Sequence, residues 1–152
     1  DKREADEYNK HGYFEIDMII DRIKKDPEIV RKYAGKALKV THFGMQYLPM
    51  GNYKVLYIER DIEEVLDSME KMIGKKDEKR DETRRLFLAY NEKVKQLMKD
   101  RSDMDYLLLD YRTIVNESES EIKKIMNFLD IPEDSERNMI EAIDPQSYRN
   151  RM

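Results

Sequence analysis

The chain has 152 residues, enough for one domain with a sizeable core. Charged residues make up 41% of it, but the net charge is only −4 and the pI is near 5.4, which argues against broad nucleic-acid binding. It has no cysteine, so disulfides, zinc–thiolate clusters and thiol nucleophiles are excluded, and no apolar run reaches the ~20 residues of a membrane span. We therefore expect a cytoplasmic protein that binds neither nucleic acid nor membrane and requires no metal.

The first predicted element is a helical stretch over residues 14–33, interrupted at Asp26 because a residue before proline disfavours helix. Three short apolar runs are then typical of β-strands: residues 36–41, 53–59 and 105–111. Each run is nearly continuously apolar, as in strands that are covered on both faces of a parallel sheet.

An amphipathic helix is predicted directly after the second strand. Its apolar stripe recurs at helical spacing and consists of Ile62, Val65, Leu66, Met69, Met72 and Ile73. Asp61 is the predicted N-cap, with Glu64 as its capping-box partner, and Gly74 ends the helix. The charged run 74–85 is predicted to be a solvated loop and a helix start, with a mobile lid over a site as the alternative.

Three more helices are predicted towards the C-terminus. The apolar stripe within residues 84–101 consists of Phe87, Tyr90, Val94, Leu97 and Met98. The next helix begins at Ser118, has Glu121 as capping partner and ends before Pro132. Its buried face is predicted to be Ile122, Ile125, Met126 and Leu129. A short helix over 135–143 follows.

The order of these elements favours an α/β fold, with a mostly parallel sheet flanked by helices. Three strands are few for such a sheet, and the sequence opens without a methionine. We therefore expect a further segment upstream of residue 1.

Arg60 directly follows a predicted strand, at the edge where open α/β sheets bind their ligands. Its guanidinium can grip a phosphate in bidentate fashion, and the next helix begins beside it. Asp61 and Glu64 weaken that helix end as an anion site, because they place carboxylates there. Two interpretations of Arg60 stay open: a phosphate ligand, or the partner of a neighbouring carboxylate in a salt bridge.

Three other residues are candidates for the site. Ser68 lies on the flank of the apolar stripe, as an ordinary boundary residue or as one that faces a ligand. His42 follows the first predicted strand and is either structural or a general base toward an acceptor hydroxyl. Lys39 can neutralise a phosphosulfate-like anion or extend along a sheet edge. The sequence contains none of the motifs G-x-x-x-x-G-K-[ST], G-x-G-x-x-G, H-E-x-x-H and G-x-S-x-G.

The segment YKVLYIERDIEEVLDSMEKM, residues 53–72, resembles the 3′-phosphate-binding strand and helix of the sulfotransferases that use 3′-phosphoadenosine 5′-phosphosulfate (PAPS). That pattern is an apolar strand ending in Arg, an acidic or small residue, and Ser eight positions after the Arg; Arg60 and Ser68 match it. The segment YLLLDYRTIVNESESEIKKIMNFLDIP, residues 106–132, resembles the family's later strand, YEDL-like turn and helix ending in FLGI. Tyr111 matches the tyrosine that lies near the adenine, whereas the turn YRTI lacks the acidic pair.

Shorter segments extend the resemblance over almost the whole chain. NKHGYFE, GKALKV and IDPQSYRNR look typical of the bacterial branch of that family. Arg149 and Arg151 resemble late basic residues that reach the 3′-phosphate. KVTH places His42 similarly to the catalytic histidine of the family's KTH strand end, with one extra residue after Lys39.

The family's GxPRSGT-like loop for the 5′-phosphosulfate is not in the sequence. We therefore expect a domain that is incomplete at its N-terminus and lacks its first strand, this loop and the first helix. The resemblance otherwise implies a single sulfotransferase-like domain over residues 1–152, with a P-loop NTPase-like sulfotransferase fold.

The resemblance also implies a site and an activity. Arg60, Ser68, Tyr111 and Arg149 are expected to hold PAPS or its product adenosine 3′,5′-bisphosphate. His42 is expected to deprotonate a hydroxyl or amine acceptor, a small molecule or a glycan. Two alternatives stay open: a non-catalytic nucleotide-binding or protein-interaction module derived from this fold, and an α-rich interaction domain in which all these residues are structural.

Overall fold

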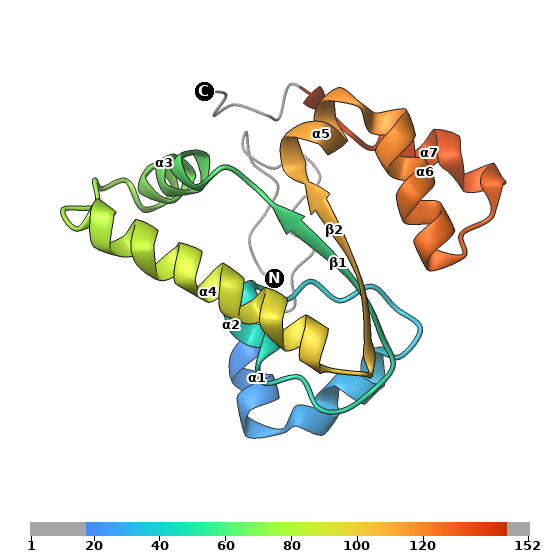
Figure 1. The fold of residues 1–152 in the computed structure, drawn as a ribbon, viewed down its shortest axis with the longest axis horizontal. Coiled ribbons are helices and arrows are strands. Elements are labelled where there is room, and N and C mark those ends of the chain that lie inside the picture. Colours follow the sequence, from blue (N-terminus) through green and yellow to red (C-terminus); the bar gives the residue numbers. More distant parts are fainter. Residues whose placement is uncertain (1–17, 146–152) are drawn as a thin grey trace. The chain divides into compact units, whose positions relative to one another are not determined.

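The computed structural model describes residues 18–145 (Figure 1). These residues group into two compact units. Within the described residues, unit 1 consists of the chain up to Gly51 together with Tyr90–Arg101, and unit 2 of Asn52–Ala89 together with the chain from Ser102 onward. Several predictions fall outside the described residues: the start of the helical stretch at residue 14, the segment NKHGYFE, and the basic residues Arg149 and Arg151.

Unit 1 contains the predicted helical stretch as two pieces, α1 (Ile19–Lys25) and the 3₁₀ helix η1 (Pro27–Tyr33). Asp26 separates them, as predicted from the effect of the following proline. α2 (His42–Met45) and the C-terminal part of α4 (Arg80–Asp100) complete the unit. The buried apolar side chains of this unit are Ile19, Ile23, Val30, Met45, Leu48, Val94 and Met98.

The predicted strand over residues 36–41 is wrong, because the backbone there is irregular. Its lysines, Lys36 and Lys39, are exposed, and only Leu38 and Val40 are partly buried. A run with strand propensity forms a strand only where a neighbouring strand pairs with it. The sheet of the described chain consists of residues 53–59 and 104–110, and the run 36–41 is not paired with either strand. The run packs through Val40 instead: a Cβ at Gly44 would lie 2.6 Å from Cγ1 of Val40, so the backbone of α2 approaches that side chain closely.

Unit 2 is built on a two-stranded parallel sheet of β1 (Tyr53–Glu59) and β2 (Met104–Asp110). The strands pair along their whole length, so that Glu59 lies opposite Asp110. Two of the three predicted strands are thus confirmed. β2 ends one residue earlier than predicted because the next residue begins α5 (Tyr111–Asn116), a helix that the sequence analysis did not predict.

One face of this sheet packs against α6 (Ser118–Leu129). Leu109 of β2 is buried with three residues of the predicted face of that helix: Ile122, Ile125 and Met126. Partly buried apolar side chains surround this core: Leu56, Leu107, Ile114, Leu129, Ile131, Met139, Ile140 and Ile143. The short predicted helix is present as η2 (Glu133–Ser135) and α7 (Glu136–Glu141).

The predicted start of α6 at Ser118 is confirmed, whereas the predicted capping box is wrong. Ser118 is the first helical residue, and Glu117 is the N-cap without a side-chain cap hydrogen bond. Glu121, the predicted capping partner, is buried and accepts a hydrogen bond of 2.5 Å from Lys124. Its carboxylate is therefore used along the helix rather than at the helix end.

The crossover between the two parallel strands consists of α3 (Ile62–Ile73), an exposed turn and α4. As predicted, the charged run 74–85 forms that turn and the start of a helix. Arg80, at the start of α4, binds three carboxylates of α3: Glu63 at 2.8 Å, Asp67 at 2.7 Å and Glu70 at 3.1 Å. Hydrogen bonds from Arg84 and Arg80 lower the pKa of Glu63 to about 2. These bonds tie the first turns of α4 to α3.

The described chain therefore has an α/β fold with a small parallel sheet and flanking helices. Within residues 18–145, no helix has both the length and the apolar character needed to span a membrane.

Candidate functional site

The carboxyl edge of the β1–β2 sheet brings together residues that are far apart in the sequence. Because the strands are parallel and Glu59 is opposite Asp110, the residues that follow both strands lie at the same edge. These residues are Arg60 after β1, and Tyr111 and Arg112 after β2. Open α/β sheets bind their ligands at this kind of edge.

Two aspartates cap the helices that begin here. Oδ1 of Asp61 accepts hydrogen bonds from the backbone N–H groups of Glu63, at 2.9 Å, and Glu64, at 3.2 Å. Oδ1 of Asp110 accepts from both the N–H and the hydroxyl of Thr113, at 2.8 and 2.9 Å. The predicted N-cap of α3 is thus confirmed, and carboxylates lie at the starts of both helices. Any attraction of an anion to this edge has to come from the arginines.

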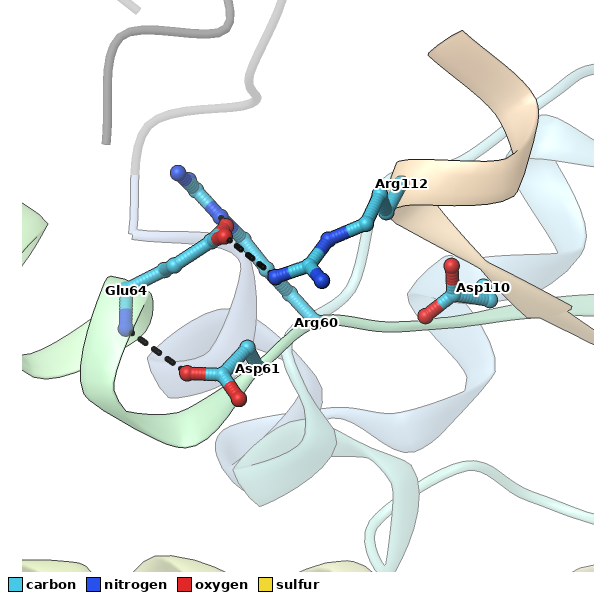
Figure 2. A pocket seen from close by; sticks show the side chains of 5 residues that line it. All are labelled: Arg60, Asp61, Glu64, Asp110 and Arg112. Carbon is cyan, nitrogen blue, oxygen red and sulfur yellow. Dashed lines mark hydrogen bonds and ion pairs between the residues drawn. The ribbon is translucent and has the colours of Figure 1, made fainter. Parts of the chain in front are cut away.

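The carboxylate of Glu64 lies between two guanidinium groups (Figure 2). Nε of Arg60 donates to Oε2 of Glu64 at 2.9 Å, and a terminal nitrogen of Arg112 donates to Oε1 at 3.1 Å. The Glu64 side chain has no exposed surface, whereas 24% of the Arg60 side chain and 49% of the Arg112 side chain are exposed. The predicted salt bridge of Arg60 therefore exists.

Arg60 also lies against an aromatic ring. The guanidinium carbon of Arg60 is 4.9 Å from the centroid of the Tyr111 ring, within the range of a cation–π contact. This contact places a planar aromatic group and a fixed cation side by side at the sheet edge.

A pocket of about 230 Å³ opens at this edge and is lined by Arg60, Asp61, Glu64, Asp110 and Arg112. Small-molecule pockets usually measure ~300–1,000 Å³. The pocket is therefore smaller than a complete nucleotide requires, and three of its five lining side chains are carboxylates.

His42 belongs to unit 1, where it is the first residue of α2. Its ring packs against Phe43, with centroids 3.9 Å apart, and against the edge of Tyr90, with centroids 5.7 Å apart. Burial lowers the pKa of His42 below its ordinary value of 6.5, because a desolvated imidazole resists protonation. The neutral form, which can accept a proton, therefore predominates at neutral pH.

A family model described as "Sulfotransferase domain" matches residues 2–151. The chain belongs to the sulfotransferase domain family. Comparisons with curated proteins and with solved structures found no match. The family match spans both units and includes every residue that the sequence analysis assigned to the site.

The structure brings together some of the predicted site residues of this sulfotransferase domain. Arg60 and Tyr111 are in contact at the sheet edge. Ser68 lies farther along α3, partly buried, and is not among the residues that line the pocket. Lys39 is exposed in the irregular segment before α2, and Arg149 lies outside the described residues.

The sequence analysis did not single out Arg112. The signal was present, because Arg112 directly follows the predicted strand 105–111 and Arg60 was singled out by the same strand-end rule. What the sequence does not contain is the pairing of β1 with β2, which brings Arg112 to the carboxylate of Glu64.

Proposed function

We propose that this sulfotransferase domain binds PAPS and transfers its sulfuryl group to a hydroxyl or amine of a small-molecule or glycan acceptor. The observation that carries the proposal is the Arg60 guanidinium, held between the buried Glu64 carboxylate and the Tyr111 ring at the carboxyl edge of a parallel sheet. The proposal includes a single P-loop NTPase-like domain and a cytoplasmic location.

The residues at this edge fit the 3′-phosphoadenosine end of the donor. Arg60 would bind the 3′-phosphate by charge-assisted hydrogen bonds, and Tyr111 would contact the adenine through its ring. Ser68 and Arg149 are proposed as further ligands of the 3′-phosphate, from their positions in the family pattern. When bound, PAPS supplies the sulfuryl group that is transferred.

His42 is proposed as the base that takes the proton from the acceptor. Its lowered pKa supports this role, because a general base must be neutral at the working pH. Transfer of a sulfuryl group, like that of a phosphoryl group, depends mainly on positioning and charge stabilisation.

The second candidate is a non-catalytic module of the same fold that binds the nucleotide without turnover. An assay of sulfuryl transfer from PAPS separates the two candidates, because the non-catalytic module would bind the nucleotide and form no product.

Titration calorimetry tests nucleotide binding with two matched ligands, adenosine 3′,5′-bisphosphate and adenosine 5′-phosphate, which differ only in the 3′-phosphate. We expect Arg60→Ala to weaken binding of the bisphosphate by about tenfold to a hundredfold, which corresponds to the loss of a hydrogen bond to a charged group. Binding of the monophosphate should change little.

Arg137→Ala is the matched control, because Arg137 is an exposed arginine of α7 whose partner is Glu141. The control should bind both ligands as the unmodified protein does. Equal bisphosphate affinity in the unmodified protein and Arg60→Ala would refute the assignment of Arg60 to the 3′-phosphate.

A further inference from the structure

We propose that Tyr90 is the positioning residue of His42: its ring holds the imidazole against α4, and Gln46 holds Tyr90 in place. The inference rests on the proposed function, because it concerns the base that is proposed to take the proton from the acceptor. All three residues belong to unit 1. The sequence analysis assigned Tyr90 only to the apolar stripe of a helix, and it did not single out Gln46.

The backbone around His42 gives its side chain little support. His42 is the first residue of α2, a helix of only four residues, and Thr41 at the N-cap makes no side-chain cap hydrogen bond. The residues before it, 36–41, are irregular. Holding a side chain in one orientation costs rotamer entropy. The orientation of the imidazole therefore depends on the residues that pack against it.

Tyr90 packs against the imidazole from a long helix. It lies in α4, which has 21 residues, and its ring meets the His42 ring edge-on, with centroids 5.7 Å apart. The Tyr90 ring is also tilted against that of Phe43, with centroids 4.7 Å apart, and Phe43 in turn packs against His42. These are distances and arrangements that aromatic pairs prefer. The three rings therefore form one cluster between α2 and α4.

Gln46 fixes the tyrosine within this cluster. Its Nε2 donates to the hydroxyl oxygen of Tyr90 at 2.7 Å and to the backbone carbonyl of Phe43 at 3.2 Å. Both hydrogens of the amide nitrogen are thereby used, one toward α4 and one toward α2. The bond to Tyr90 joins α4 to the turn that carries His42, and loss of the hydroxyl alone would break it.

The orientation of the ring decides what an acceptor meets. Nε2 of His42 is buried, so an acceptor can approach a ring nitrogen only at Nδ1. A half-turn of the ring would place the carbon Cδ2 where Nδ1 had been, and a carbon cannot take the proton. The cluster therefore holds the orientation that a base requires, and its burial of the ring also lowers the pKa of His42. Lys93 carries a charge at this cluster, with its Nζ 5.4 Å from the centroid of the Tyr90 ring.

NMR titration of the histidines in the complete chain tests the inference. The chain has two, His11 and His42, and His42→Asn identifies the signal of His42. We expect the pKa of His42 in Tyr90→Ala to lie closer to 6.5 than in the unmodified protein, because water reaches the imidazole once the tyrosine ring is removed. Tyr90→Phe and Gln46→Met each break the hydrogen bond but keep the ring. Both should shift the pKa of His42 in the same direction and by less.

Two control variants separate this contact from other effects. Tyr33→Ala makes the same change in a partly buried tyrosine of η1, in the same unit, which makes no ring contact with His42 in the described part of the chain. Lys93→Gln removes the charge at the cluster and keeps all three rings. Both should leave the pKa of His42 close to that in the unmodified protein. Thermal unfolding shows which variants are folded; should Tyr90→Ala not fold, Tyr90→Phe and Gln46→Met decide the proposal.

The failure of this inference differs from a failure of the proposed function. An unchanged pKa of His42 in Tyr90→Ala would refute the inference and leave the proposed role of His42 as it stands. A shift of equal size in Tyr33→Ala would also refute the inference, because it would reflect a loosening of the whole unit. If His42→Asn transfers the sulfuryl group of PAPS as fast as the unmodified protein does, the proposed base is refuted, and the inference falls with it.

Discussion

At the scale of single residues, His42 shows how a local environment sets a protonation state. In an unfolded chain, histidine takes up a proton near pH 6.5, whereas burial lowers the pKa of His42 in the fold. Below about pH 6.5 the native state therefore binds fewer protons than the unfolded state. The neutral, buried form of His42 therefore makes its full contribution to the free energy of unfolding above about pH 6.5. That contribution is lost as the pH falls below this value.

We therefore predict that the protein loses stability between about pH 7.5 and pH 5.5, and that His42→Asn loses less over the same interval because it cannot be protonated there. Urea denaturation at the two pH values measures the difference. Tyr47→Phe is the control in the same unit, since it removes one hydroxyl and keeps the histidine. An identical pH dependence in His42→Asn and the unmodified protein would contradict the prediction.

Single residues of the site were predictable to the extent that their signals are local. Arg60 was identifiable because an apolar run ends at it, and its salt-bridge interpretation rested on carboxylates within four positions. The structure contains the salt bridge to Glu64, and the phosphate role stays a prediction. The role of Arg112 depends on a contact across 48 positions in the sequence, and no local pattern records which strand pairs with which.

At the scale of elements, α3 shows how a helix is ended. Gly74 adopts φ 71°, a left-handed conformation, and its N–H donates to the carbonyls of Glu70 and Lys71. Open space surrounds the position of a Cβ at Gly74, so a substitution there acts through backbone strain alone.

We predict that Gly74→Ala lowers the free energy of unfolding by about 1 kcal/mol, the usual cost of a left-handed conformation for a residue with a Cβ. Lys75→Ala, at the next position, should have little effect because its side chain is exposed. Urea denaturation of the two variants checks this. A Gly74→Ala variant as stable as Lys75→Ala would show that the helix end relaxes without strain.

The elements that the sequence predicted correctly are those with signals of their own. For α3, the N-cap, the apolar stripe and the terminal glycine all lie within the helix or next to it. The run 36–41 has the composition of a strand, but no neighbouring strand of the described chain pairs with it. The short helix α5 was not predicted because its capping residue, Asp110, was interpreted as part of a strand. Pairing and short helices are decided by neighbours in space rather than by composition.

At the scale of the whole molecule, the alternation of strands and helices was enough to predict the α/β class. It did not predict the grouping into two units. α4 contributes to both units, with the residues before Tyr90 in unit 2 and the rest in unit 1. The core of unit 2 lies between β2 and α6, where Leu109 is only 4% exposed. The neighbouring Leu108 is 44% exposed, because successive side chains of a strand point to opposite faces.

We predict that Leu109→Ala lowers the free energy of unfolding by about 2–5 kcal/mol, since it leaves a cavity in that core. Leu108→Ala makes the same chemical change one position away and should have a much smaller effect. Chemical denaturation compares the two variants directly. Equal losses would mean that the core of unit 2 does not lie on the α6 side of the sheet.

The pairing of β1 with β2 also fixes a distance at the carboxyl edge of the sheet. The hydrogen-bonded ladder from Tyr53 to Glu59 sets how far Arg60 lies from the residues after Asp110, whatever the length of the chain that connects them. Insertions and deletions in the turn after Gly74 should therefore accumulate during evolution without changing the positions of Arg60 and Arg112. The loss of one residue within β1 or β2 would shift that edge by about 3.3 Å, a strand's rise per residue, and turn its side chains to the other face.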